Sequence, residues 1–202
     1  MKMDAYRKAI FENVVAYFAC EFHDFHGYWP AQTWIYKFLA LLDFGMMRKT
    51  GVPALGLEYK ALENGPAPKI LYDHRDNIAN SKFKFEHPAN SQSNRFDIIA
   101  EEPDMDQIPG CIVDEMDLIC NKYLQEGIDL DDVIYDTHEN IRAWRVAWEK
   151  AKKNKCNSQP MSFADEFEDD LNEIDDKNLT PAQDAFLFYE ATRYLETPAE
   201  VY

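Results

Sequence analysis

The sequence has no apolar run that approaches the roughly 18 residues needed to cross a bilayer. Its beginning, Met1–Ile10, mixes charges and lacks the apolar stretch and small-residue cleavage site of a secretion signal. The four cysteines are scattered over 202 residues without a close pair, unlike the disulfide framework of a small secreted domain. We therefore expect a cytoplasmic protein with reduced thiols and no membrane partner.

Motifs of common enzyme classes are also missing. The chain contains no G-x-S-x-G nucleophile elbow, no G-x-x-x-x-G-K-[ST] phosphate loop and no G-x-G-x-x-G dinucleotide loop. Cys20, His23 and His26 form a C-x2-H-x2-H pattern, but zinc sites commonly use a second, separated pair of ligands and none is evident here. The sequence predicts no cofactor and no metal site. The alternative hypothesis for these three residues is a metal-assisted hydrolase.

What the chain does have is apolar content and acid. Hydrophobic residues make up 46% and aromatic residues 14%, which is too apolar for a disordered chain and enough for a folded core. Residues 1–96 carry 12 basic and 10 acidic residues, whereas residues 97–202 carry 9 and 27, so the net charge of −16 belongs to the second half. Such a negative surface repels phosphate and opposes broad binding to nucleic acid.

Helical periodicity dominates the first part of the chain. Amphipathic helices, each with one apolar stripe, are expected over residues 4–22 and from Pro30 to the breaker Gly51. A short helix is expected over Ala54–Glu63, before an Asn-Gly-Pro cluster. Another short helix is expected over Pro68–Tyr72.

Two segments in the middle switch to the pattern of strands. Lys82–Glu86 alternates polar and apolar residues, Arg95–Ala100 is a second strand candidate, and turn-forming residues lie between them. Together they predict a small antiparallel hairpin around residues 82–100. The expected fold class is therefore mainly α (α+β): a compact helical domain with this hairpin inserted.

The second half returns to helices, expected over 112–124, 129–135 and 137–153. A polar stretch then indicates a linker ahead of the tail. The domain organisation that follows is one domain over residues 1–153, and a linker with an acidic, helical C-terminal extension over residues 154–202.

The tail combines acid with regularly spaced apolar residues. Ser162–Asp176 contains eight acidic residues and no basic one. Its apolar residues are spaced four, four and three apart: Phe163, Phe167, Leu171 and Ile174. This predicts a helical stripe and a candidate partner contact, since the acids would attract a basic surface and the stripe would dock in a groove. The alternative is that the stripe packs on its own domain. Thr180–Gln183 predicts the capped start of a last helix, which reaches Leu195.

Basic residues cluster only at Arg142–Lys155, around Trp144 and Trp148. Such a stripe could contact phosphates and stack on bases. The favoured interpretation is one buried tryptophan face, with lysines near a helix C-terminus where positive charge is stabilised. His138, just before this cluster, is more often a capping or core residue than a general base.

Three segments share an order that is typical of one family. Trp34–Phe44 is a helix of the K-x-L-x-L-L-x-F type, Tyr59–Tyr72 runs through a Gly-Pro pair, and Asp136–His138 precedes a helix with a tryptophan. The residues that carry the pattern are Lys37, Phe38, Leu42, Tyr59, Ala61, Gly65, Pro66, Thr137, His138 and Trp144. In this order they resemble the Panacea domain, the SocA-like antitoxin domain also seen in phage-associated GepA-like proteins, over roughly residues 5–150.

The resemblance implies a non-enzymatic antitoxin that neutralises a cognate toxin by direct protein–protein binding. SocA-like members also suggest an adaptor that hands the bound toxin to a protease. The pattern residues look like scaffold: Gly65-Pro66 would form a turn, Phe38 would join the core, and Thr137 would cap the helix that contains Trp144. The alternative function is a phage-associated binding or proteolytic-adaptor protein without an adjacent toxin.

Overall fold

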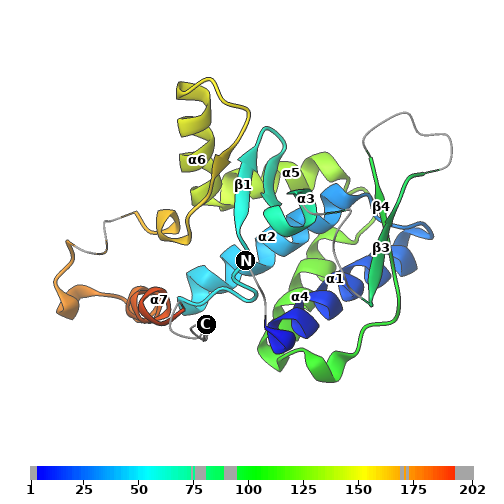
Figure 1. The fold of residues 1–202 in the computed structure, drawn as a ribbon, viewed down its shortest axis with the longest axis horizontal. Helices are drawn as coiled ribbons and strands as arrows, with labels where there is room; N and C mark the ends of the chain where they lie inside the picture. Colours follow the sequence, from blue (N-terminus) through cyan, green and yellow to red (C-terminus); the bar gives the residue numbers. More distant parts are fainter. Residues whose placement is uncertain are drawn as a thin grey trace, which may run out of the picture.

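The computed structural model describes residues 4–73, 75, 81–88, 95–168, 171 and 173–193. In this part of the chain the architecture is mainly α with small antiparallel sheets, which confirms the expected fold class (Figure 1). The helices are α1 (Ala5–His26), α2 (Gln32–Thr50), α3 (Lys69–Asp73), α4 (Gly110–Tyr123), α5 (Leu130–Asn140), α6 (Arg142–Lys153) and α7 (Pro181–Thr192). The strands are β1 (Tyr59–Leu62), β2 (Gly65–Pro68), β3 (Phe83–Glu86), β4 (Asp97–Ala100) and β5 (Gln159–Pro160). No helix of the described residues is both long and apolar enough to cross a membrane.

Helix α2 lies at the centre of the molecule, in contact with α1, α4, α5, α7 and β2 (Figure 1). Every residue from Trp34 to Gly45 is buried. The expected one-sided stripe is therefore wrong, because a helix that is covered on all sides has no solvent face. This burial includes two side chains that are charged in water at neutral pH, Lys37 and Asp43.

Helix α1 forms where the sequence predicts a helix and is longer than expected, but its buried surface is broader than one stripe, because every residue from Ile10 to Ala16 is buried. The Asp4 side chain caps it by accepting a hydrogen bond from the backbone N–H of Arg7 at 2.8 Å. The helix continues to His26 and ends at Gly27, whose N–H donates to the His23 carbonyl.

The segment expected as a helix over Ala54–Glu63 contains a strand instead. β1 pairs antiparallel with β2, and Leu62 lies opposite Gly65 across a two-residue turn. Side chains along β1 alternate between buried and half-buried, so one face of the strand meets the core. The cluster read as a helix breaker is a hairpin turn, with Glu63 and Asn64 as its two central residues and Gly65 after them at a φ of +94°.

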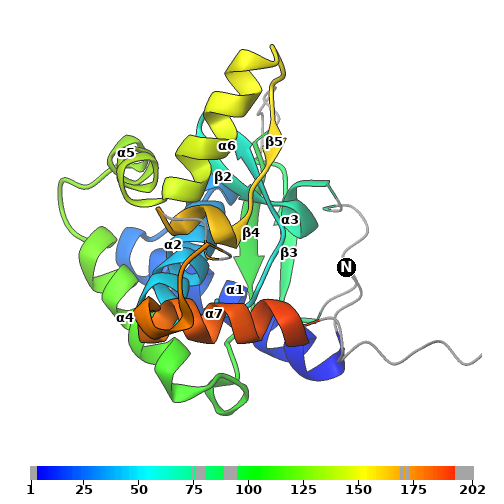
Figure 2. The same cartoon turned by 90° about the vertical axis from the view of Figure 1, so that its left-hand side faces the viewer.

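A third strand joins this sheet from the expected linker. β5 pairs with β1, with Pro160 opposite Lys60, and the N–H of Met161 donates to the Tyr59 carbonyl at 3.0 Å. Figure 2 shows β5 next to α6, with α6 projecting at the top of the view.

The second hairpin, β3–β4, confirms the prediction around residues 82–100. Its register places Phe83 opposite Ala100 and Glu86 opposite Asp97. The backbone N–H of Ile98 also donates to the Pro30 carbonyl at 2.9 Å, which ties β4 to the α1–α2 connection. Part of the predicted turn, residues 89–94, lies outside the described residues.

Helices α5 and α6 divide at a different residue than expected. The break is at Ile141, which has an extended backbone and is fully buried, rather than at Asp136. Thr137 therefore lies in the last turn of α5, and its hydroxyl donates to the Ile134 carbonyl at 2.7 Å. The expectation that Thr137 caps the helix of Trp144 is wrong.

The described residues of Ser162–Asp176 form no long helix. They contain a 3-10 turn, η3 (Phe163–Glu166), and a second one, η4 (Asp176–Asn178), begins at the end of this range. The capping box predicted at the start of α7 is confirmed: Thr180 Oγ1 accepts from the N–H of Gln183, and the Gln183 side chain accepts from the N–H of Thr180. The expected helix end at Leu195 lies outside the described residues.

Candidate functional site

The three family-like segments meet around the side chain of Lys37. This lysine lies in the middle of α2, is 2% exposed, and donates a hydrogen bond to the Pro66 carbonyl of β2 at 3.0 Å. Thr137 and His138 reach the same place from α5. Segments that are about 30 and 100 residues apart in the sequence thus share one buried contact.

Gly65 is the point of closest approach between these segments. A Cβ at this position would lie 2.9 Å from Lys37 Nζ, 2.9 Å from Thr137 Oγ1 and 3.3 Å from His138 Nε2. Its backbone φ of +94° is also an angle that residues with a Cβ rarely adopt. Both the space and the backbone therefore require glycine.

Trp144 closes this cluster from α6. Its ring stacks on His138 and its Nε1 donates to the Leu62 carbonyl at 3.0 Å, so one side chain joins α5, α6 and β1. Among the described residues, His138 Nε2 is buried without a hydrogen-bond partner. We name Lys37, Gly65, Thr137, His138 and Trp144 the buried motif cluster.

The electrostatics of this cluster follow from its burial. Removal from water lowers the pKa of Lys37 to about 7. Burial, and then the nearby charge of Lys37, lower the pKa of His138 to about 4. Both groups are pushed towards their neutral forms, as expected where a positive charge has little solvent and no carboxylate of the described residues acts on it.

A second buried polar group fixes the loop that leads into β1. The carboxylate of Asp43 accepts hydrogen bonds from the N–H groups of Leu55, Gly56 and Leu57 at 2.6, 3.1 and 3.1 Å. The hydroxyl of Tyr59 lies 2.9 Å from the same carboxylate. Burial raises the pKa of Asp43 to about 6, although these four hydrogen bonds oppose the shift.

The remaining pattern residues are core. Phe38, Leu42 and Ala61 are fully buried, and Phe38 packs against Phe18 with ring centroids 5.3 Å apart. The buried motif cluster and its surroundings hold the hairpin against α2 and α5. With Lys37 covered, the cluster supports the fold.

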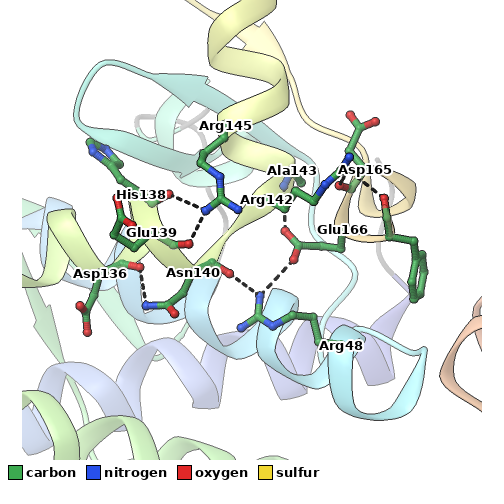
Figure 3. Close-up of polar contacts among 11 residues, drawn as sticks. Arg48, Asp136, His138, Glu139, Asn140, Arg142, Ala143, Arg145, Asp165 and Glu166 are labelled. Atoms are coloured by element: carbon green, nitrogen blue, oxygen red, sulfur yellow. Dashed lines mark hydrogen bonds and ion pairs between the residues drawn. The ribbon is translucent and has the colours of Figure 1, made fainter. Parts of the chain in front are cut away.

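Arginine side chains hold the junction between α5 and α6 (Figure 3). Arg48 donates to the Asn140 carbonyl at 2.8 Å, and Arg145 donates to the carbonyls of His138 and Glu139. These cations satisfy the exposed carbonyls at the C-terminus of α5 and complement its negative end.

Glu166 interacts with the other helix end at this junction, the N-terminus of α6 (Figure 3). Its side chain is 1% exposed, accepts from the N–H of Ala143 at 2.9 Å and pairs with Arg48 at 3.1 Å. Burial raises the pKa of Glu166, although the Ala143 hydrogen bond and the Arg48 charge oppose the shift. Arg142 then donates to the carbonyls of Asp165 and Phe167, so the tail is fastened to α6.

The four tail residues proposed as a partner stripe all lie in the core or pack against it. Phe163 is 8% exposed and packs on Phe44 with ring centroids 4.7 Å apart, and Leu171 is 7% exposed. Phe167 and Ile174 are half-buried against the same core. The helix predicted from this spacing is wrong, because Glu166 and Arg142 fasten the segment to α6 in a non-helical conformation after η3.

Two of these residues nevertheless line a groove. It lies between α6, the segment that begins with η3, and α7, and has a volume of about 510 Å³. Its lining residues are Arg142, Val146, Ala164, Asp165, Phe167, Glu168, Leu171, Phe186, Leu187 and Glu190. We name it the C-terminal groove. Sequence reasoning missed the contributions of α6 and α7, because only the folded tail brings them together.

Cys20, His23 and His26 do not converge. Cys20 Sγ donates to the Glu101 carbonyl at 3.6 Å, and His23 stacks on Trp29 with ring centroids 4.2 Å apart. Within the described ranges, no three His, Cys, Asp or Glu side chains are grouped so that they could hold a metal ion.

The tryptophan face predicted for α6 is buried at one of its two residues, and most of the basic residues around it are exposed. Trp144 is 7% exposed, Trp148 is half-buried, and their rings are 6.3 Å apart. Lys150, Lys152 and Lys153 lie in the last turn, where they complement the helix dipole.

Comparison with known proteins gives no relative. The chain matches no protein-family model, no curated protein and no solved structure.

Proposed function

We propose that this protein is a cytoplasmic, non-enzymatic antitoxin that neutralises a cognate toxin by direct protein–protein binding. The observation that carries the proposal is the buried motif cluster. Lys37, Gly65-Pro66 and His138 come from separate segments and meet at one contact, as expected if these segments form the pattern of one domain of the Panacea type.

The burial of this cluster supports a scaffold role for the pattern residues, as expected if the partner binds elsewhere on the surface. Lys37 and Trp144 are 2% and 7% exposed, and their polar atoms bond to backbone carbonyls of the hairpin. Such residues act on a partner through the shape that they give to the surface, because they do not reach it themselves.

Co-expression with the product of the adjacent gene tests the proposal. The adjacent product alone should arrest growth, and growth should recover when the full chain is produced with it. The two purified proteins should form a complex of defined stoichiometry in size-exclusion chromatography and calorimetry. A harmless neighbour, or rescue without a complex, would refute neutralisation by contact.

The same cells distinguish simple binding from delivery to a protease. In stoichiometric neutralisation the half-life of the toxin stays constant or lengthens when the antitoxin is present. In the adaptor route the toxin disappears faster with the antitoxin than without it, and this loss stops in a protease-deficient strain. Chase experiments on tagged toxin measure the difference.

A further inference from the structure

The C-terminal groove has an apolar floor. Phe167 packs on Phe186 with ring centroids 5.3 Å apart, and Phe186 is 2% exposed. Val146 of α6 and Leu187 of α7 are half-buried and face the groove from its two sides. A concave surface with several apolar side chains suits anchor residues of a partner.

Acidic side chains line the same groove. Asp165, Glu168 and Glu190 contribute carboxylates, and residues 161–193 contain ten acidic and two basic residues. Asp165 lies 3.7 Å from the largely exposed Lys150, and Glu190 lies 3.0 Å from Arg193. Among the described residues Glu168 forms no ion pair. Arg142 also lines the groove and, with Lys150 and Arg193, balances these three carboxylates. The excess of acid comes from the wider segment, ten acidic against two basic residues over 161–193, and this field attracts positive charge.

The wall of the groove is held in place before any partner arrives. Arg142 donates to the Phe167 carbonyl at 2.8 Å and to the Asp165 carbonyl, and the buried Glu166 binds both Arg48 and the N-terminus of α6 (Figure 3). A surface that is already ordered loses little conformational entropy on binding, which favours affinity.

We propose that the C-terminal groove binds an amphipathic segment of the cognate toxin, with its apolar side chains on Phe167 and Leu187 and its basic side chains towards Glu168. This inference rests on the proposed function and names the surface that performs it. Charge complementarity selects the occupant: a second copy of this chain carries a net charge of −16 and is repelled by the acidic segment around the groove.

Two neighbouring residues of α7 provide a matched test. Leu187 lines the groove, whereas Phe188 is 72% exposed and does not line it. Leu187→Arg should weaken binding of the purified adjacent-gene product by at least about 30-fold, the loss typical of an interface hot spot. Phe188→Arg should change the affinity by less than about threefold. The point variants are preferable to deletion of 161–202, which would also remove the core residue Phe163.

A charge reversal tests the groove without touching its apolar floor. Glu168→Lys should slow association with the adjacent-gene product several-fold and flatten its dependence on salt, because a steering charge is reversed. Glu149→Lys changes an exposed acid of α6 that does not line the groove, so its association rate should stay near that of the parent. Stopped-flow kinetics at two salt concentrations measure both. Since Glu168 is exposed, this pair decides the matter even if Leu187→Arg fails to fold.

The outcomes separate the two proposals. If the parent chain fails to neutralise the adjacent product, the proposed function is wrong. If the parent neutralises it and both groove variants bind like their controls, the function stands and the groove assignment is overturned. If the parent self-associates in sedimentation and Leu187→Arg abolishes only that association, the groove joins copies of this chain and the toxin assignment is likewise overturned.

Discussion

The indole ring of Trp144 lies parallel to the imidazole of His138, with planes 2° apart and ring centroids 3.7 Å apart. The two residues stand on either side of the break at Ile141, so the stack bridges the ends of α5 and α6. The same indole donates to the Leu62 carbonyl at the end of β1. One tryptophan therefore fixes the angle between two helices and the position of the hairpin that packs on them.

Replacement of Trp144 by alanine should lower the free energy of unfolding by about 3–5 kcal/mol, as for other buried large-to-small changes. Trp144→Phe should cost less, because an aromatic ring remains over His138 while the hydrogen bond to Leu62 is lost. Denaturant titration measures both variants. Trp148→Ala is the control, since Trp148 is only half-buried and should cost less than Trp144→Ala. Equal losses for the two alanine variants would contradict a special role for the stack.

Gly65→Ala should destabilise the fold by more than backbone strain alone explains. Its Cβ would approach Lys37 Nζ and Thr137 Oγ1 to 2.9 Å, and its φ is +94°. Gly127 has a similar φ of +86° with open space around a Cβ, so Gly127→Ala isolates the backbone cost of roughly 1–2 kcal/mol. In thermal unfolding, Gly65→Ala should have a clearly lower midpoint temperature than Gly127→Ala. A similar shift in the two would show that the close approach costs nothing.

Lys37 should make stability depend on pH. Its folded pKa of about 7 lies below the ordinary value of 10.5, so between these values the unfolded chain holds a proton that the folded chain has released. Stability therefore rises with pH across this window, by about 1.4 kcal/mol for each unit of pKa difference. Lys37→Met should lack this rise. The difference in free energy of unfolding between parent and variant from pH 7 to 10 gives the contribution of Lys37, because the tyrosines titrate in both proteins and their contribution cancels.

The same variant should act on His138. Because the charge of Lys37 helps to lower the pKa of His138, Lys37→Met should raise that pKa from about 4 towards 6.5. Titration of the imidazole resonances by NMR measures the change. An unmoved His138 would mean that burial alone lowers its pKa.

Glu166→Gln should cost roughly 1–3 kcal/mol, because it removes the charge that faces Arg48 and weakens the hydrogen bond that caps α6 at Ala143. The exposed pair of Lys84 and Glu86 is the control, and Glu86→Gln should change stability by less than about 1 kcal/mol. Urea unfolding of the two variants gives the comparison. If both changes are neutral, the buried carboxylate does not fasten the tail.

Much of the helical framework could be predicted because its signals are local. The apolar period over α1, the breaker at Gly51 and the capping box at Thr180 each act within a turn or two of the chain. The alternating pattern of β3 is equally local. These elements formed where the sequence predicted them.

The wrong predictions concern segments whose secondary structure is set by contacts with residues far away in the sequence. Tyr59–Leu62 is too short for periodicity to separate helix from strand, and it becomes β1 because β2 and β5 pair with it on both sides. The break at Ile141 carries no proline or glycine, and is set by a buried side chain and by the cap that Glu166 supplies from 23 residues beyond Ala143. Neither partner is visible in a local window.

By itself the sequence determined the fold class and most helices, because apolar period and capping are properties of neighbouring residues. The residues of the buried motif cluster were singled out only by their resemblance to a family pattern. The sequence could not determine that α2 is covered on every side, that Lys37 loses its solvent, or that Phe167 and Leu171 face α7 across the C-terminal groove. Those properties depend on which segments meet in space, and the free energy of desolvation exists only once they have met.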